Sequence, residues 1–268
     1  MSTENSNQNM TAMAVKLIKI LIVLIAAFVS NTLKAQDSNI QLWEKANAAY
    51  LSQNYNEAVE GYEQILRTGQ TSAKLYFNLG NAYFKNGQTN LAILYLERAK
   101  LLDPNNKDID FNIAFVNQNV VTKLEPLPQP FFVRWRASIL NMHSTDTWAI
   151  ISISAFITFL LLAGLFIFSK IVLVRRISFI SGIVILLLSI FTFSFAGKQK
   201  KKISQRNSAI VFCPRVTVKS APTATSTNLF LIYEGVKVEL TDSIGTWKEI
   251  KLADGNEGWL QDSCIVKI

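Results

Sequence analysis

Two long apolar runs with a short basic segment between them constrain this 268-residue chain more than any other feature. Thr147–Ser169 and Ile177–Ala196 are 23 and 20 residues long, and neither contains a charged side chain. At about 1.5 Å of rise per helical residue, each run can cross a hydrocarbon core of about 30 Å. The segment 170–176 is too short to cross back. We therefore predict a transmembrane hairpin over 147–196, whose two flanking regions face the same side of one membrane.

The net charge of +8 is concentrated around these apolar runs. Residues 123–206 carry a net charge of +9, whereas 36–122 and 207–268 carry −2 and −1. Lys and Arg beside membrane helices meet anionic head groups, so membrane lipid is the predicted contact of this excess. A nucleic-acid partner is not expected, because neither flanking region has the basic surface that such binding needs.

Residues 1–35 are predicted to be a signal peptide. Lys16 and Lys19 precede a short apolar core, Ile20–Val29, and small or polar residues lead to a cleavage site after Ala35. An uncleaved membrane anchor is the alternative. In either case a basic leader stays in the cytoplasm and exports the segment that follows it.

The charges around the hairpin favour the opposite orientation. The hairpin loop holds three basic residues, and the flanks outside the two apolar runs hold seven. The positive-inside rule alone would place both flanking modules in the cytoplasm. Because the first export signal usually dominates, we predict an inner-membrane protein with two transmembrane helices and both soluble modules in the periplasm.

The segment 36–121 is predicted to be helical and internally repeated, with units at about 40–70 and 73–106. The second unit has small, aromatic and leucine anchors at helical spacing: Tyr76, Leu79, Gly80, Tyr83, Ala92, Leu96 and Ala99. In the first unit, which is one residue shorter, the corresponding positions are occupied by Trp43, Ala46, Asn47, Tyr50, Ala58 and Tyr62. This pattern resembles the tetratricopeptide repeat, which implies pairs of antiparallel helices that bind proteins. Residues 107–120 resemble a further first helix that caps the open end.

The first helix of the second unit carries the candidate partner-binding residues. Lys74, Asn78, Asn81 and Lys85 are separated by steps of four, three and four, so they form a stripe distinct from the packing residues. The family resemblance implies that first helices line the concave surface and that Asn81 corresponds to the peptide-binding asparagine. The amides can bond a peptide backbone, the lysines can meet a carboxylate, and Phe84 adds apolar contact. A plain solvated helix face is the alternative.

Residues 122–146 are predicted to form a neck. The Pro-rich segment 124–130 is typical of a stiff linker. Phe131, Trp135 and Ile139 then recur every four residues beside Arg134 and Arg136. This pattern fits an amphipathic helix lying in the head-group layer, and it fits equally well a helix packed against the repeats. After the hairpin, 197–207 is predicted to be a basic linker.

Residues 208–268 show period-two patterning with turns, which predicts a small β module. Val216–Pro222, the Gly-Thr-Trp-Lys stretch from Gly245 and the Asp-Gly-Asn-Glu-Gly-Trp turn that ends at Trp259 resemble a bacterial Src-homology-3-like (SH3-like) barrel. The predicted fold class is therefore multidomain: an all-α tetratricopeptide repeat module, a two-helix transmembrane hairpin and a small all-β SH3-like barrel. Tyr233, Trp247 and Trp259 form either a ligand shelf or part of the barrel core.

Cys213 and Cys264 are the only cysteines, and we predict that they lie in the first and last strands of the β module. In this barrel class the first and last strands lie side by side, so the two residues can form a disulfide in an exported domain. Two small core residues are the alternative.

No catalytic, cofactor-binding or metal-binding site is predicted. The single histidine, His143, has no second ligand type near it in the sequence, and no phosphate loop or nucleophile elbow is present. We therefore do not expect an enzyme.

The order of leader, repeats, Pro-rich neck, membrane hairpin and SH3-like barrel resembles the BatE family of the Bacteroides aerotolerance operon. The neck, Leu124–Phe132, and the closing turn before Trp259 add to the likeness. The resemblance implies an envelope protein that acts beside membrane-anchored von Willebrand factor A-type Bat proteins. Two functions are consistent with these features, namely a scaffold that holds a protein through its repeats or a module that binds peptidoglycan through its barrel.

Overall fold

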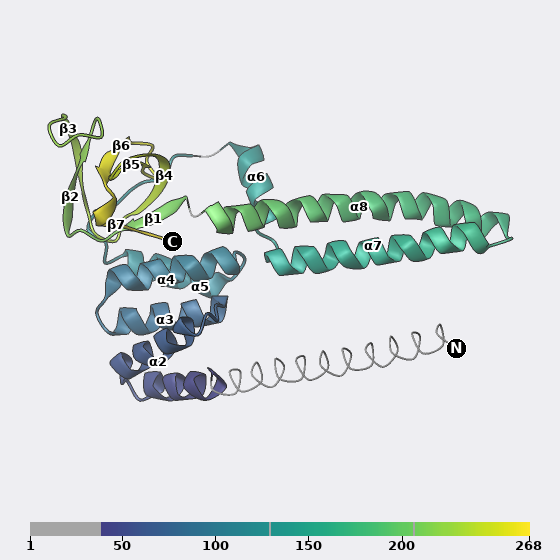
Figure 1. Ribbon diagram of the computed structural model, residues 1–268, viewed down its shortest axis with the longest axis horizontal. Coiled ribbons are helices and arrows are strands. Elements are labelled where there is room, and N and C mark those ends of the chain that lie inside the picture. The colour runs from purple at the N-terminus through teal and green to yellow at the C-terminus, as the bar shows by residue number, and fades with distance from the viewer. Residues whose placement is uncertain (1–38, 129, 206) are drawn as a thin grey trace, which may run out of the picture. The chain divides into compact units, whose positions relative to one another are not determined.

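The computed structural model describes residues 39–128, 130–205 and 207–268 (Figure 1). The chain divides into two compact units, Met1–Gln70 and Thr71–Ile268. The multidomain fold class is confirmed, because the chain contains a helical repeat module, two long apolar helices and a seven-stranded antiparallel sheet. The predicted signal peptide, residues 1–35, lies outside the described residues.

The first unit contains a helical pair formed by residues 39–51 and by α2, Tyr55–Arg67. The helices meet at small side chains, since a Cβ added to Gly61 would lie 2.9 Å from the Cβ of Ala46. The hydroxyl of buried Tyr62 donates a hydrogen bond of 2.6 Å to Asn47 Oδ1. In the turn between the helices Gln53 has a φ of 62°, a left-handed conformation that is unfavourable for residues with a Cβ. The corresponding turn of the second repeat uses Gly87, with a φ of 78°.

The second compact unit, Thr71–Ile268, begins with α3, Ala73–Lys85, and α4, Thr89–Leu102. Ser72 caps α3, because its Oγ accepts a hydrogen bond of 3.1 Å from the backbone N–H of Leu75. A Cβ added to Gly80 would lie 2.8 Å from Leu96 Cγ, so this helix pair packs as closely as it does only because Gly80 has no side chain. A third helix, α5 (Lys107–Asn117), follows and contacts α4.

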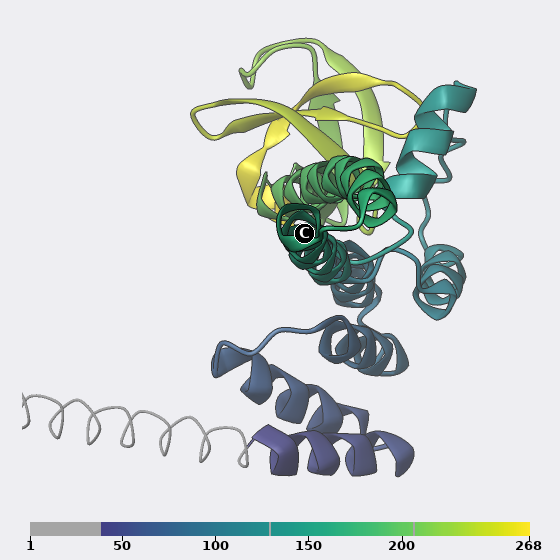
Figure 2. The same cartoon turned by 90° about the vertical axis from the view of Figure 1, so that its right-hand side faces the viewer.

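The hairpin consists of α7, Thr145–Phe168, and α8, Val172–Gln205. The two helices run side by side, as Figures 1 and 2 both show, and both are long and apolar enough to cross a membrane. Two buried serines join them through reciprocal hydrogen bonds of 3.0 Å, in which each hydroxyl donates to the other residue's carbonyl: Ser152 and Ser189. Most of the apolar side chains elsewhere on the hairpin are exposed, as expected for helices that face lipid.

Helix α8 is longer than the apolar run that predicts it. The helix begins at Val172, inside the predicted loop, and continues to Gln205, inside the predicted basic linker. The apolar run marks only the part that can cross hydrocarbon. The flanking Lys, Arg and Gln residues are good helix formers, and no Gly or Pro interrupts residues 198–205, so the helix extends past both limits.

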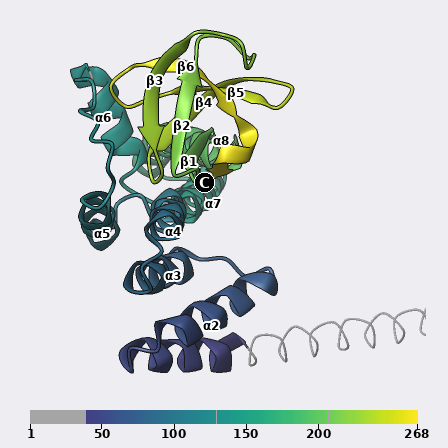
Figure 3. The same cartoon turned by 90° about the vertical axis from the view of Figure 1, so that its left-hand side faces the viewer.

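The β module contains seven antiparallel strands in the order β3-β2-β6-β5-β4-β1-β7 (Figure 3). The strands are β1 Ser208–Val211, β2 Arg215–Lys219, β3 Asn228–Tyr233, β4 Lys237–Ile244, β5 Trp247–Lys251, β6 Glu257–Gln261 and β7 Ile265–Lys267. Register shifts after Val218 and Leu240 bend the sheet, which curls around a core that includes Ile232, Ile250 and Leu260. The module is therefore barrel-like.

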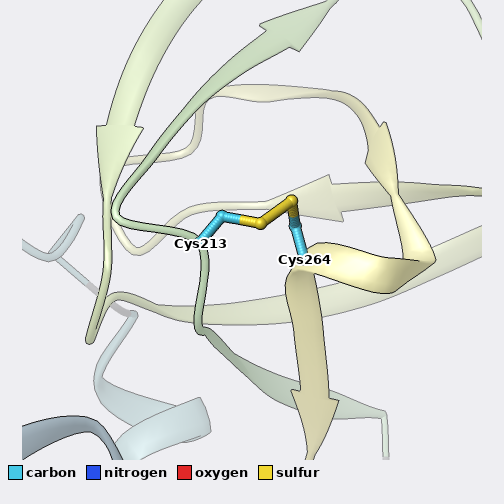
Figure 4. Close-up of a disulfide and its surroundings, with 2 residues drawn as sticks. All are labelled: Cys213 and Cys264. Atoms are coloured by element: carbon cyan, nitrogen blue, oxygen red, sulfur yellow. A yellow bond between two sulfur atoms is a disulfide. The ribbon is translucent and has the colours of Figure 1, made fainter.

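A disulfide joins Cys213 and Cys264, with their Cα atoms 4.9 Å apart (Figure 4). Strand β1 pairs with β7, and just beyond this pairing the backbone N–H of Phe212 donates a 2.8 Å hydrogen bond to the carbonyl of Cys264. The cysteines lie in the turn after β1 and in the short 3-10 helix η1, Asp262–Cys264, and so just outside the two strands. The disulfide thus closes the end of the module's first and last strands.

Candidate protein-binding face of the second repeat

Helix α3 separates its packing residues from the predicted binding residues. Leu79, Gly80 and Tyr83 are buried against the rest of the module. The predicted binding residues lie on the other side of the helix. Lys74 and Lys85 are exposed, and the three others are half-buried: Asn78, Asn81 and Phe84. Lys74 and Lys85 lie near opposite ends of α3, about 16 Å apart along its axis.

Helix α5 contributes to this face as well. Asn112 Nδ2 donates a hydrogen bond of 2.8 Å to Asn81 Oδ1. The ring of Phe84 meets that of Phe115 edge to face, with 5.6 Å between centroids, and Phe111 stacks on Phe115 at 6.4 Å. We call these five residues, Asn81, Phe84, Phe111, Asn112 and Phe115, the α3–α5 face.

The sequence pattern predicts α5 only as a cap, and three members of this face are absent from the predicted binding residues: Phe111, Asn112 and Phe115. One signal could have identified two of them. Phe111 and Asn112 lie one repeat length, 34 residues, after Phe77 and Asn78 of α3. The periodicity therefore continues into α5, and the predicted binding face extends onto this helix.

The aromatic side chains of α5 point away from the packed interior. Phe111 and Phe115 are 69% and 47% exposed, whereas Ile109 and Val116 on the same helix are 2% and 1% exposed. A terminal capping helix usually has a polar outer face. Aromatic side chains that remain exposed next to amides are typical of an interaction site.

The face suits recognition of an extended peptide. Each side-chain amide has both donor and acceptor atoms, so Asn81 and Asn112 keep hydrogen-bonding capacity beyond the bond that joins them. The three phenylalanine rings offer apolar contact, and Lys74 and Lys85 add positive charge at the two ends of α3. This combination of amides, aromatic rings and lysines is suited to holding a peptide chain.

The opposite side of the repeat is occupied by the chain's own β module. On α4, the side chain of Glu97 is only 10% exposed and accepts a 2.6 Å hydrogen bond from Lys237 Nζ of β4. Arg98 donates a 2.8 Å hydrogen bond to the carbonyl of Lys267, and Asn90 donates one of 2.6 Å to Glu234. We call this contact the α4–β junction.

Gly235 lies at the α4–β junction, where both its backbone conformation and the space around it favour a residue without a side chain. Its φ is 82°, and a Cβ added to it would lie 3.0 Å from Val120 Cγ2 and 3.3 Å from Ile93 Cδ1. A residue with a side chain would therefore be strained in its backbone and crowded by the repeat. Only the fold shows that a second module approaches this glycine.

The neck is also held against the β module. The backbone N–H of Tyr233 donates to Thr122 Oγ1 at 3.1 Å, and the backbone N–H of Leu127 donates to the carbonyl of Ala253 at 3.0 Å. The Pro-rich composition indicates stiffness, but it does not reveal these contacts. The neck is thus attached at two points and is not a free spacer.

The family comparison identifies the helical pair that carries this face. Residues 73–106 match the tetratricopeptide repeat family. The match spans α3 and α4, and such repeats are helix–turn–helix units whose stacked surfaces commonly bind proteins. A comparison of the chain with curated proteins finds no match.

The other sequence-predicted candidates occupy different parts of the structure. His143 contacts Trp148 edge to face, with 5.1 Å between ring centroids. Within the described ranges, no three His, Cys, Asp or Glu side chains converge as metal ligands would. In the β module Trp259 belongs to the core at 9% exposure, while Tyr233 and Trp247 are half-buried on strands separated by β2 and β6. Trp259 is therefore too buried to contribute to the predicted aromatic ligand shelf.

Proposed function

We propose that this protein is a non-enzymatic, membrane-anchored scaffold of the cell envelope that holds a protein partner on the α3–α5 face of its tetratricopeptide repeat. The observation that carries the proposal is the amide pair Asn81–Asn112 beside the exposed aromatic ladder of Phe84, Phe115 and Phe111. Exposed rings contribute little to folding, whereas a partner that covers them gains apolar burial.

The partner we propose is an extended peptide segment with apolar side chains and an acidic group near one end. The amide pair would bond its backbone, the rings would take its apolar side chains, and Lys74 or Lys85 would meet the carboxylate. At about 3.3 Å per residue, about five extended residues cover the distance between the two lysines.

The anchor we propose is the hairpin of α7 and α8 in the inner membrane, with both soluble modules in the periplasm. The predicted leader supports export, and so does the disulfide, because disulfides persist in oxidising compartments. The order of modules supports a finer assignment, in which the partners are von Willebrand factor A-type Bat proteins. Peptidoglycan binding by an SH3-like barrel is the second candidate, and the burial of Trp259 weakens it.

The scaffold proposal is tested by cross-linking and recovery of the full-length protein from native membranes. Phe115→Ala should reduce recovery of the principal cross-linked protein at least tenfold. Ile244→Ala is the matched control, because Ile244 is another exposed apolar residue, 52% exposed on β4. Equal recovery with wild type, Phe115→Ala and the double variant Asn81→Ala/Lys85→Ala would show that the α3–α5 face is not the binding site.

The orientation is tested with reporter fusions after Val120 and after Ile268. Both positions should support a reporter that is active only when exported. A reporter that is active only in the cytoplasm, working at both positions, would instead show that the basic flanks set the orientation.

A further inference from the structure

Helix α6, Phe131–Leu140, exposes an aromatic side to its surroundings. At about 100° per residue, Phe131, Trp135 and Phe132 fall within an arc of about 100°. Their side chains are 74%, 60% and 69% exposed, and none of the ten residues of α6 is buried. A helix packed against the repeats through its aromatic residues would bury them, so that alternative does not describe this structure.

Arginines border the aromatic arc on both sides. On the same helical wheel Arg134 lies about 60° beyond one edge and Arg136 about 40° beyond the other. Both arginines are exposed, whereas Val133 and Ala137 on the opposite side are half-buried. The helix thus has an outward aromatic side with a cation on each flank, which is the arrangement found in helices that lie in a membrane interface.

The C-terminal end of α6 packs against the hairpin at the level where the apolar part of the hairpin begins. Ile139 and Leu140 pack against a cluster of Trp148, Phe195 and Ala196. The Leu140 carbonyl also accepts a 3.2 Å hydrogen bond from Trp148 Nε1. Trp148 and Ala196 lie at the ends of the charge-free runs of α7 and α8, and tryptophan is enriched at this depth in membrane proteins.

The direction of α6 also suits a membrane surface. Figures 1 and 2 show α6 running across the direction of α7 and α8 and not alongside them. If the hairpin crosses the bilayer, a helix that ends at this level and runs across the hairpin follows the plane of the head groups.

We infer that α6 lies in the head-group layer of the membrane, with Phe131, Phe132 and Trp135 among the upper acyl chains and Arg134 and Arg136 on phosphates of anionic lipids. The occupant of the aromatic side is thus a phospholipid surface, and charge complementarity and the junction with Trp148 select it. This inference rests on the proposed membrane anchoring. Its consequence is that the neck is braced against the membrane.

The test uses the full-length protein in lipid nanodiscs with a nitroxide label at one introduced cysteine. The native cysteines do not compete for the label, because they form the disulfide. Trp135→Cys reports on α6, Ile157→Cys on the exposed surface of α7, and Thr241→Cys on an exposed site of β4. Collision with oxygen measures contact with lipid, and collision with a water-soluble nickel chelate measures contact with water.

The expected result is a high ratio of oxygen to nickel collisions at positions 135 and 157 and a low ratio at 241. A ratio at 135 equal to that at 241, with 157 remaining lipid-exposed, would overturn the inference and leave the anchoring intact. A low ratio at 157 would overturn the anchoring and this inference together.

The arginine contacts are tested by changing the lipid. In nanodiscs rich in phosphatidylglycerol, Arg134→Gln/Arg136→Gln should lower the lipid-exposed population of a label at 135 by about fivefold per arginine. In zwitterionic phosphatidylcholine the same change should have little effect. An equal effect in both lipids, or none in either, would show that the arginines do not bind anionic phosphates.

Discussion

The two sides of the tetratricopeptide repeat differ in whether the chain itself covers them. At the α4–β junction the chain covers the repeat with its own β module and pairs Glu97, at 10% exposure, with Lys237. On the α3–α5 face, Phe111 and Phe115 stay 69% and 47% exposed, and no element of the described second unit buries them. A buried carboxylate without its cation destabilises the fold, whereas an exposed aromatic ring can remain in contact with water until a binding partner covers it. The comparison indicates that α4 serves the protein's own architecture and that α3 and α5 remain available for binding.

Removing the disulfide should have the largest effect, because it acts on the module that covers α4. The cysteines are 51 residues apart, so the chain-entropy model predicts that Cys264→Ser lowers the free energy of unfolding of the β module by about 4 kcal/mol. Urea unfolding followed by tryptophan fluorescence measures the loss, and reductant added to the wild type should reproduce it. A loss below about 1 kcal/mol would mean that the strand ladder alone holds the module closed.

The α4–β junction can be opened sterically at Gly235. Gly235→Ala should cost about 2–3 kcal/mol, because it adds crowding against Val120 to the strain of a positive φ. Gly245→Ala is the matched control. Gly245 also has a positive φ, but an added Cβ there meets nothing within 4 Å, so only the backbone cost of about 1–2 kcal/mol applies. Equal losses in the two variants would indicate that the β module does not press against the repeat at Gly235.

The ion pair of the same junction should contribute less. Lys237→Ala leaves the Glu97 carboxylate nearly buried without its cation, but Lys237 itself is 48% exposed, so we expect a loss of about 1–2 kcal/mol. Arg67→Ala, which breaks the more exposed Arg67–Glu63 pair, should cost less than about 0.5 kcal/mol. Thermal unfolding of both variants compares the two pairs. A loss at Lys237 as small as that at Arg67 would contradict the assignment of Glu97 as a buried anchor.

The open face should respond least in stability and most in binding. Asn81→Ala/Lys85→Ala removes one half-buried amide hydrogen bond and one exposed charge, so the free energy of unfolding should change by less than about 1 kcal/mol. Circular dichroism should show unchanged helicity, while recovery of the cross-linked partner falls. A larger stability loss than that of Lys237→Ala would reverse the roles that the comparison assigns to the two sides.

Local patterns in the sequence were sufficient for features that a single element decides. The two uncharged runs predict two long apolar helices, because length and hydropathy alone determine whether a helix can cross a bilayer. The small residues Gly80, Ala92 and Ala99 predict that their two helices can pack closely, and the structure places Gly80 against Leu96. Period-two alternation likewise predicts the β module, since one side of each strand must face a core.

Features that depend on two distant elements were decided only by the tertiary structure. The approach of Val120 to Gly235 and the attachment of Leu127 to Ala253 join surfaces that no local periodicity relates. The repeat spacing indicates that Asn112 belongs to the same face as α3, but only the fold shows that it bonds Asn81. A pattern describes how residues lie around the axis of their own helix or strand, but not which surface will cover them. The aromatic residues of α5 and α6 have the spacing of core residues, and only the packing of the folded chain shows that they remain outside it.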